Sequence, residues 1–494
     1  MRAPGTKRGQ RATPATLSAR LVGHVTLQAQ TSGEIVACFD GFSVGLGTFS
    51  AAAAERAEGL RTGLPLSSFA PDGRDVDKEI HLLVRRLAAR GLLEYRLGPS
   101  RKGETQAAAQ VVIEPQVPDY WPRMSPLGDA DVLVLSRFAY MRRRANEMIL
   151  ESPRAGALFK ICNPKIAAAL AMLSAPQPIK GLRRQDGFPG VELLALLVDC
   201  QILFKIEAGA DDGLRPAEGD DNLVLWDFHD LVFHARSTEG RHANPVGGLY
   251  PYVGIMNPLP AVRPPWPGKN IDLRAFSAAP SQALSGVEKL LRERHSTREF
   301  DEQRPITLAE LSRFLDRTAR VVSELKTPLD PEGGGPVLTY TMRPYPSAGA
   351  SYELELYLAV DKCDGFPRGF YHYDAGGHAL VPIDVRTHEF DALLKGAQLA
   401  MEASAAPQIL ITIAARFGRI SWKYSSIAYG LILRDVGVLI QTFYLTATDM
   451  GLGGCAIGST NIELFAKMTG IEFHVEGAVG QFAIGRGTQP VASD

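Results

Sequence analysis

Residues 294–298 read Arg-His-Ser-Thr-Arg and decide how the rest of the sequence is interpreted. This stretch places three potential cations and two hydroxyls within five residues. It begins at the last residue of 285–294, a run that is predicted to form the end of a helix. Guanidinium groups bind phosphate oxygens in two-point contacts, and hydroxyls suit a polyol chain. A phosphate joined to a ribityl chain, as in FMN, therefore fits. The alternative is a solvated basic helix end, and the five residues alone leave both open.

The composition is that of an ordinary folded protein. The chain has 494 residues, enough for about three domains, with 45% hydrophobic and 22% charged residues. A net charge of −1 gives no support to bulk attraction to nucleic acid or to a membrane surface. The five cysteines are scattered without a Cys-X-X-Cys pair, which argues against a disulfide framework and favours a reducing compartment. We therefore expect a cytoplasmic protein.

Neither a secretory signal nor a membrane span is predicted. Residues 1–20 are basic and rich in Ala, Thr and Pro but lack an apolar core, so we expect a disordered arm. Elsewhere, charged residues interrupt every apolar run of about 18 residues, as Asp199 and Arg434 do in the two best candidates.

The front of the chain predicts two winged-helix-like units. In 21–115, apolar residues at helical spacing predict a helix over 76–90, Gly91 suits its C-terminal cap, and 92–97 is predicted to be a strand. In 130–210, a hairpin, two helical stretches and a closing strand repeat that plan with little sequence identity. Two unrelated α/β segments are the alternative.

The back of the chain predicts an α+β domain over 273–490. A linker block at 223–272, with aromatic anchors and a proline-rich loop, precedes it. Within the domain, Thr307-Leu-Ala-Glu310 is a capping box that opens a helix. Strands are expected at 354–360, 369–373, 408–414 and 477–484, and long helices at 388–402 and 427–449. Helices mixed with a mostly antiparallel sheet give the α+β class.

Two further clusters suit a flat ligand. The loop Arg343-Pro-Tyr-Pro-Ser-Ala-Gly349 ends in a residue without a side chain, which lets the backbone come close, and Ser347 can donate to a ring heteroatom. The stretch Gly451-Leu-Gly-Gly-Cys-Ala-Ile-Gly458 has four glycines in eight residues but lacks the strand-then-helix context of a dinucleotide fingerprint. An ordinary loop and a helix C-cap are the respective alternatives.

A last cluster, Gly485-Arg-Gly487, follows a predicted strand, so Arg486 can complete a phosphate clamp, although a lone terminal arginine is usually solvated. With these four clusters in this order, residues 281–487 resemble the FMN-dependent nitroreductase superfamily. More narrowly, they resemble the SagB-type dehydrogenases, the azoline oxidases of thiazole- and oxazole-modified peptide pathways. The block 226–241 resembles the linker of that group. The two front units resemble the peptide-clamp domains of cyanobactin-type oxidases. Those domains are similar to the recognition elements that bind ribosomally made peptides.

The resemblance implies how FMN is held at its phosphate end. Arg294, His295 and Ser296 would bind the phosphate and ribityl chain, with Arg298 nearby and Arg486 closing the clamp.

It also implies how the ring is held. Two short stretches would lie along it, the first from the partner subunit of a homodimer and the second by backbone: Pro346, Ser347, Ala348 and Gly349, then Gly453 and Gly454. One departure is Ala350-Ser351, where many superfamily members carry Asn, and this fits azoline oxidases better than generic nitroreductases.

Azoline oxidases carry a catalytic Lys-Tyr pair at the position of Lys423-Tyr424, ahead of the long helix. Making an azole removes a proton from the carbon alpha to the carbonyl and a hydride, which the flavin accepts. Lysine can serve as the base if burial or a positive field lowers its pKa, and tyrosine if the lysine stabilises its phenolate. Adjacent residues share a target only off a regular strand, so a loop or helix start is expected. A surface lysine beside a packing tyrosine is the alternative.

The expected function is FMN-dependent oxidation of thiazolines or oxazolines in a ribosomally made peptide, with dioxygen regenerating the flavin. The azoline-containing precursor peptide, bound by strand addition to a wing edge, and a heterocyclase are the implied partners. An NAD(P)H-dependent nitro or quinone reductase is the alternative, followed by a peptide-binding scaffold with a degenerate flavin domain. His234, His242 and His295 lack metal-ligand spacing, so no metal is expected. The charge balance argues against a nucleic-acid partner.

Overall fold

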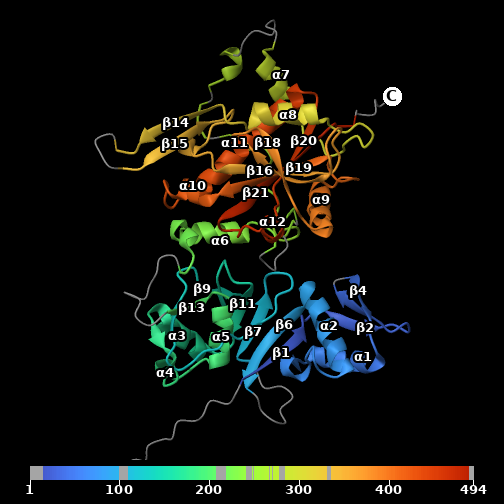
Figure 1. Ribbon diagram of the computed structural model, residues 1–494, viewed down its shortest axis with the longest axis vertical. Helices are drawn as coiled ribbons and strands as arrows, with labels where there is room; N and C mark the ends of the chain where they lie inside the picture. Colours follow the sequence, from blue (N-terminus) through green and yellow to red (C-terminus); the bar gives the residue numbers. More distant parts are fainter. Residues whose placement is uncertain are drawn as a thin grey trace, which may run out of the picture. The chain divides into compact units, whose positions relative to one another are not determined.

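The computed structural model describes residues 15–39, 41–99, 109–206, 218–240, 247–248, 250–265, 267–269, 271–276, 284–330 and 335–488. The chain folds as two compact units, Met1–Asn244 and Pro245–Asp494 (Figure 1). Of the predicted arm at 1–20, residues 1–14 lie outside the described residues. Residues 15–20 belong to the first strand and not to an arm, because their alternating side chains are buried in a sheet.

The first half of unit 1 places two helices beside short strands. α1 (Ala51–Ala57) and α2 (Asp75–Ala89) pack together, and α2 buries Ile80, Leu83, Val84 and Leu87, as the helical spacing predicted. Gly91 has a φ of 67°, a left-handed conformation that ends the helix, and β6 (Leu93–Pro99) follows. A separate antiparallel sheet contains β2 (Thr26–Ala29), β3 (Glu34–Phe39) and β4 (Phe42–Thr48).

One antiparallel sheet runs through both halves of unit 1. Its strand order is β5-β1-β6-β7-β11-β10-β9. Besides β6, its strands are β1 (Ala15–Leu21), β5 (Leu64–Pro65), β7 (Val111–Pro115), β9 (Tyr140–Arg144), β10 (Glu147–Glu151) and β11 (Ala157–Ile161). Because β6 pairs with β7 and β7 pairs with β11, the two predicted front units share a sheet and an apolar core.

The second half of unit 1 repeats the helix–turn–strand order of the first. Its helices are α3 (Pro164–Ala171), α4 (Ile179–Leu182) and α5 (Val191–Asp199), and its own small sheet contains β12 (Gln177–Pro178), β8 (Val132–Leu135) and β13 (Leu203–Ile206). Gln201, with a φ of 54°, lies between α5 and β13, as Gly91 lies between α2 and β6. The repeated order is observed, and the winged-helix assignment stays a prediction.

The linker block contains a helix that the sequence pattern did not predict. α6 (Phe228–Arg236) follows Trp226, whose ring stacks on His234 with centroids 5.9 Å apart. Both side chains are buried, so His234 belongs to a packed core. Nine residues with a buried aromatic contact at one end give too few helical turns for a clear apolar period.

Unit 2 is built on a six-stranded antiparallel sheet with the order β18-β17-β16-β19-β21-β20. Its strands are β16 (Leu354–Val360), β17 (Gly369–Asp374), β18 (Ala379–Ile383), β19 (Ile409–Arg416), β20 (Gly453–Ile457) and β21 (Glu476–Gly485). All of β19 except Arg416 is buried, which explains its continuous apolar run. This sheet, mixed with helices, confirms the α+β class.

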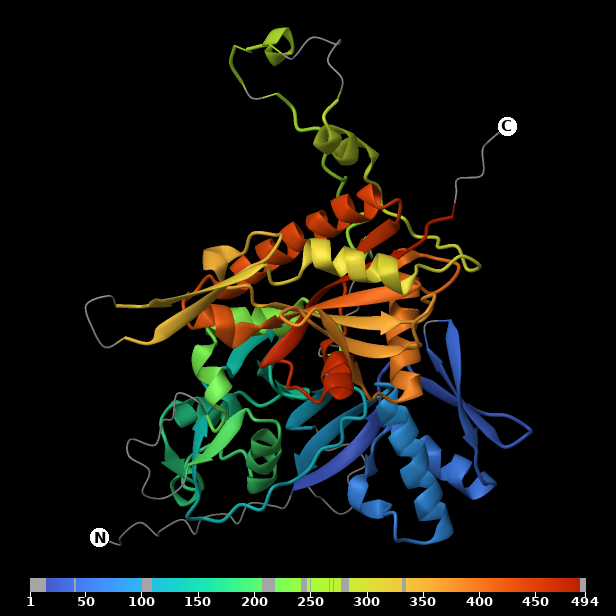
Figure 2. The ribbon, with the colours of Figure 1, turned by 45° about the horizontal axis from the view of Figure 1, so that its top comes forward.

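Helices cover both faces of this sheet (Figure 2). On one face, α9 (Thr387–Met401) and α12 (Ile462–Thr469) share a core in which Phe465 contacts Tyr357 of β16. On the other, α8 (Leu308–Thr318) and α11 (Ala428–Asp449) meet where Phe443 contacts Phe314. α7 (Gly286–Glu293) and α10 (Phe417–Ser421) also contact α11.

α11 is long and apolar enough, by length and composition alone, to cross a membrane. The charged pair Arg434-Asp435 within this apolar run argues against a span. In unit 2 the helix packs on β20, β21 and α8, and Asp435 is among its buried residues. The core helix of a folded domain meets the same length and hydropathy criteria.

The region between α8 and β16 shows one confirmed and one missed feature. Thr307 caps α8: its Oγ1 accepts from Glu310 N at 3.2 Å and its own N–H donates to the Glu310 carboxylate at 2.9 Å, as the capping box predicted. The hairpin of β14 (Ser323–Pro328) and β15 (Val337–Met342) was not predicted. Its apolar residues, such as Leu325 and Met342, are exposed, so no buried face marks it in the sequence.

Candidate functional site

The stretch 294–298 is held against α11 by one tyrosine. The Ser296 and Tyr444 hydroxyls lie 2.8 Å apart, and Tyr444 also accepts from Ala456 N at 2.8 Å. The Arg294 guanidinium lies 5.0 Å from the centre of the same ring. When Tyr444 donates to Ser296, the serine keeps its own hydroxyl proton for another acceptor. Sequence reasoning missed Tyr444, whose only signal was a tyrosine inside a mostly apolar helix.

The same stretch runs beside β20 and the end of β21. Thr297 N donates to Gly454 O at 2.8 Å, and Phe300 bridges to Gly487. A Cβ on Gly453 would lie 2.6 Å from Thr297 Cγ2, and one on Gly454 would collide with the Phe482 ring. Both glycines are therefore required by close packing within the chain, whatever ligand they approach.

The glycine-rich stretch 451–458 is a helix end followed by a strand. Gly451, with a φ of 68°, follows the C-terminus of α11, as the C-cap alternative predicted. Gly453 and Gly454 open β20 and pair with Gly485 and Ile484 of β21. Gly453 and Gly454 thus lie in an outer strand, and their predicted approach to the flavin ring stays a prediction.

The cations at this end of the site remain available to an anion. Arg294 is half-buried and Arg298 is exposed, and neither forms an ion pair with a carboxylate within the described ranges. His295 is exposed, and its Nδ1 lies 3.0 Å from Glu293 O. Two guanidinium groups and a free hydroxyl proton on one short stretch fit a phosphate.

Arg486 has an acidic partner. Its Nη2 donates to both carboxylate oxygens of Glu310 at 2.8 Å. Burial works to raise the pKa of Glu310, but the Thr307 N–H and the Arg486 guanidinium outweigh it, and the pKa is lowered. Arg486 lies close to the clamp, because its carbonyl accepts from Asp301 N. Its predicted contact with a phosphate stays a prediction, in competition with Glu310.

The Ser347–Ala350 turn is fixed by a buried acid. Asp435 of α11 accepts from Ser347 Oγ and from Ala348 N, each at 2.8 Å. Gly349 and Ala350 both adopt left-handed conformations, with φ of 56° and 54°. The hydroxyl that we expected to meet a ring heteroatom is thus directed to Asp435. Pro346 and Gly349 are exposed, so the turn presents backbone to solvent.

Lys423 and Tyr424 lie against this turn. They follow α10 in a helical turn in which both N–H groups donate to Ile420 O at 3.0 Å, so the expected non-strand backbone is present. Lys423 Nζ donates to Gly349 O at 3.1 Å and lies 5.4 Å from the centre of the Tyr424 ring. A Cβ on Gly349 would collide with the Tyr424 hydroxyl. The lysine is exposed and the tyrosine half-buried.

The predicted residues therefore form two groups along α11. The phosphate-like group is anchored at Tyr444, and the turn with Lys423 is anchored at Asp435. These anchors are nine positions apart, which is about 14 Å along a helix axis. Within the described part of the chain, no hydrogen bond or ion pair joins the two groups.

One cluster has the composition of a metal site. Asp227, His229 and Asp230, at the start of α6, place their ligand atoms within 4.8 Å of one another. His229 is exposed, and acidic groups of this kind are common at surfaces without an ion.

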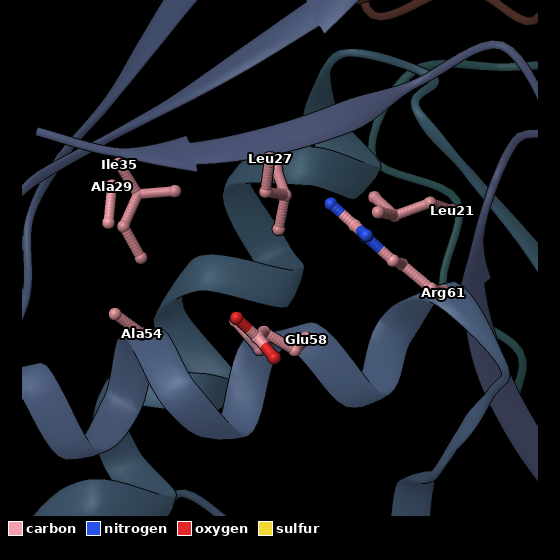
Figure 3. A pocket seen from close by; sticks show the side chains of 8 residues that line it. Leu21, Leu27, Ala29, Ile35, Ala54, Glu58 and Arg61 are labelled. Carbon is pink, nitrogen blue, oxygen red and sulfur yellow. The ribbon is translucent and has the colours of Figure 1, made fainter.

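Two cavities occur in unit 1. One, of about 60 Å³, lies between α1 and the strands β1 to β3, with Glu58 and Arg61 among its lining residues (Figure 3). The other, of about 250 Å³, is lined in part by Arg85, Trp121 and Arg154. Both are smaller than the roughly 300–1,000 Å³ of most small-molecule sites.

Two family models match the chain. One, described as cyanobactin oxidase ThcOx, matches residues 133–243 in unit 1, and the other, described as the nitroreductase family, matches 291–486 in unit 2.

Individual proteins resemble parts of the chain. A putative nitroreductase of Methanocaldococcus jannaschii is 33% identical over 175 residues, covering 35% of this chain and 78% of that protein. The trifolitoxin-processing protein TfxB of Rhizobium leguminosarum bv. trifolii is 25% identical over 144 residues, covering 28% of this chain and 39% of TfxB. A chain of the E. coli microcin synthetase McbBCD complex with truncated pro-MccB17 bound is 19% identical, covering 56% of this chain and 98% of that one, with a TM-score of 0.38.

Proposed function

The chain belongs to the nitroreductase family of oxidoreductases, and from this premise we propose that it is an FMN-dependent oxidase of thiazolines and oxazolines in a ribosomally made peptide. The observation that carries the proposal is the contact of Lys423 Nζ with Gly349 O, which brings the proposed base to the turn proposed to lie along the flavin. The cyanobactin oxidase match in unit 1 supports a peptide substrate over a small nitro compound.

Arg294, Ser296 and Arg298 would hold the phosphate and ribityl chain. Support comes from their arrangement: the two guanidinium groups lack carboxylate partners in the described ranges, and Ser296 keeps a hydroxyl proton when Tyr444 donates to it. His295 would contribute from the exposed side, and Arg486 would add a third cation if it leaves or shares Glu310. The fit of this donor set favours FMN over a flavin without a phosphate.

Lys423 and Tyr424 would remove the proton from the ring carbon alpha to the carbonyl. A bound flavin would supply the acceptor for the accompanying pair of electrons. Lys423 must be neutral to accept a proton, and its hydrogen bond to Gly349 O leaves the lone pair of the neutral amine pointing elsewhere. Tyr424, half-buried beside it, is placed to share the proton. In total, each ring loses two protons and two electrons, with dioxygen as the proposed final acceptor.

A homodimer would complete the site. In a single chain the two groups of predicted residues are anchored nine positions apart on α11, and no hydrogen bond or ion pair among the described residues joins them. Several apolar residues of α7 and of the β14–β15 hairpin are exposed, among them Val287, Leu291 and Leu325, which suits burial against a second copy. Residues 346–349 of one subunit would then face the phosphate group of the other.

Unit 1 would bind the precursor peptide at a sheet edge. β9 is the outermost strand of its sheet and lies within the cyanobactin oxidase match. A peptide segment would add to this edge as a further strand, and Arg142 and Arg144 of β9 already pair with Glu151 and Glu114. A heterocyclase that makes the azolines is the proposed enzyme partner.

Mass spectrometry of an azoline-bearing peptide tests the reaction. Incubation with the FMN-loaded protein in air should remove two hydrogen atoms per ring, and flavin-free protein should remove none. Rapid reduction of bound flavin by NAD(P)H with turnover of a nitroaromatic, and no change in the peptide, would instead favour a reductase, which the likeness to a putative nitroreductase keeps as the second candidate.

A further inference from the structure

Two buried carboxyl groups meet beside the Ser347–Ala350 turn. Glu353, which precedes β16, is 0% exposed, and Asp435 of α11 is 6% exposed. Ser347 Oγ lies 2.8 Å from Asp435 Oδ2 and 3.2 Å from Glu353 Oε2. The Ser347 hydroxyl therefore lies between two buried acids.

The donors present are too few for two carboxylates. Ser347 has a single hydroxyl proton, and its oxygen already accepts from Tyr352 N at 2.9 Å. Asp435 has a second donor in Ala348 N, but Glu353 Oε1 has no partner in the described part of the chain. Two ionised carboxylates that both contact one serine hydroxyl in a buried site are strongly unfavourable. A proton on Glu353 resolves the shortage, because the acid then donates to Ser347 Oγ while the Ser347 hydroxyl donates to Asp435.

The charged and titratable neighbours do not neutralise the pair. Arg343 donates from Nη1 to Leu354 O at 3.1 Å and makes no ion pair with either acid in the described ranges. Tyr345 is buried, and its hydroxyl has no hydrogen-bond partner among the residues that the structure describes. Glu355, two residues along the chain, pairs with His372 and Arg416 instead. Burial, reinforced by Asp435, raises the pKa of Glu353 to about 7.

We propose that Glu353 and Asp435 share one proton, and that this proton positions the Ser347–Ala350 turn against Lys423. The turn is tied to Asp435 through Ser347 Oγ and Ala348 N, and its next residue, Gly349, accepts from Lys423 Nζ. When Glu353 ionises, its charge competes with Asp435 for the Ser347 proton and draws in water, which loosens the turn and frees Lys423. Glu353 is thus a positioning residue. Only the catalytic role of Lys423 in this scheme rests on the proposed function.

Infrared spectroscopy tests the shared proton without any substrate. The carboxylic acid C=O band of the purified protein should contain one component that disappears near pH 7. That component should be missing in Glu353→Gln and present in Glu355→Gln, the matched change two residues away. In Asp435→Asn, which removes the competing charge, the component should titrate at lower pH. An unchanged band in Glu353→Gln, or no shift in Asp435→Asn, overturns the shared proton.

Selective labelling tests the positioning. Acetic anhydride modification of Lys423, measured as a ratio to exposed Lys467 by mass spectrometry, should rise between pH 6 and about pH 8 in the wild type, across the raised pKa of the buried acid. In Glu353→Gln, which mimics the protonated acid, the ratio should stay flat over that range. A ratio that rises equally in both proteins overturns the positioning role. Neither readout needs azoline oxidation, so a failure here is distinct from a failure of the proposed function.

Discussion

Lys423 donates from Nζ to the carbonyl oxygen of Gly349 across 3.1 Å, although 74 residues separate them in the chain. The contact joins the end of α10 to the turn before β16. Gly349 is left-handed, and a Cβ on it would lie 2.6 Å from Lys423 Nζ. The position of the lysine therefore depends on the backbone of the turn as much as on its own side chain.

Replacement of Lys423 should separate catalysis from cofactor binding. Lys423→Ala should lower azole formation by about 10²- to 10⁴-fold, the usual effect of losing a general base. FMN content should be unchanged, because the residues proposed to hold the phosphate lie in the stretch 294–298, which is anchored at Tyr444, far along α11 from Lys423. Peptide mass spectrometry and flavin absorbance measure the two effects. The control is Lys467→Ala, which changes an exposed lysine on α12. Full activity in Lys423→Ala would exclude Lys423 as the base.

Alanine at Gly349 should disturb the site more than the fold. Gly349 and Gly365 both have positive φ, 56° and 76°, so alanine at either should cost about 1–2 kcal/mol of backbone strain. At Gly365 nothing lies within 4 Å of the added methyl, whereas at Gly349 it meets Lys423 and Tyr424.

Thermal unfolding should thus show a similar loss of stability in both variants, while only Gly349→Ala loses azole formation. Equal activity in the two would mean that the packing of Gly349 against Lys423 does not matter to the reaction.

The guanidinium of Arg298 should contribute to FMN affinity. A hydrogen bond to a charged group contributes about 1.5–3 kcal/mol, so Arg298→Ala should weaken FMN binding by about 10- to 100-fold. Flavin fluorescence titration gives the dissociation constant. Arg292→Ala, on the exposed part of α7, is the matched control. Equal affinities for the two variants would place the phosphate elsewhere.

Local patterns predicted the elements of unit 2 better than the partners of its side chains. The strand 354–360 and the Thr307 cap followed from apolar runs and a local motif. The pairing of Arg486 with Glu310 joins residues 176 apart and leaves no trace in either local sequence. Tyr444 was missed for the same reason.

Burial also changed the meaning of predicted residues. Ser347 was predicted to face a ligand because its hydroxyl can donate to a ring heteroatom and Gly349 lets the backbone come close. Its hydroxyl instead meets Asp435, a buried acid on α11 that lies 88 residues further along the chain. Gly453 and Gly454 were predicted to contact the flavin because they lack side chains. In the structure, the groups that leave no room for a side chain at these positions are Thr297 and Phe482. A sequence pattern indicates that space is restricted but not what restricts it.

The apolar face of α7 should be required for a dimer and, through it, for flavin binding. Val287 and Leu291 are 62% and 51% exposed, and α7 has no buried residue although it is strongly amphipathic. Glutamates at both positions, Val287→Glu with Leu291→Glu, should yield a monomer in light scattering, because two buried charges would oppose association.

If residues 346–349 complete the flavin site of the other subunit, the same double variant should also lose FMN. Lys289→Glu with Arg292→Glu adds two glutamates to other positions of the same helix and should leave both mass and flavin content unchanged. A monomer that retains FMN would show that one chain holds the cofactor by itself, and the two groups along α11 would then have to be bridged within a single subunit.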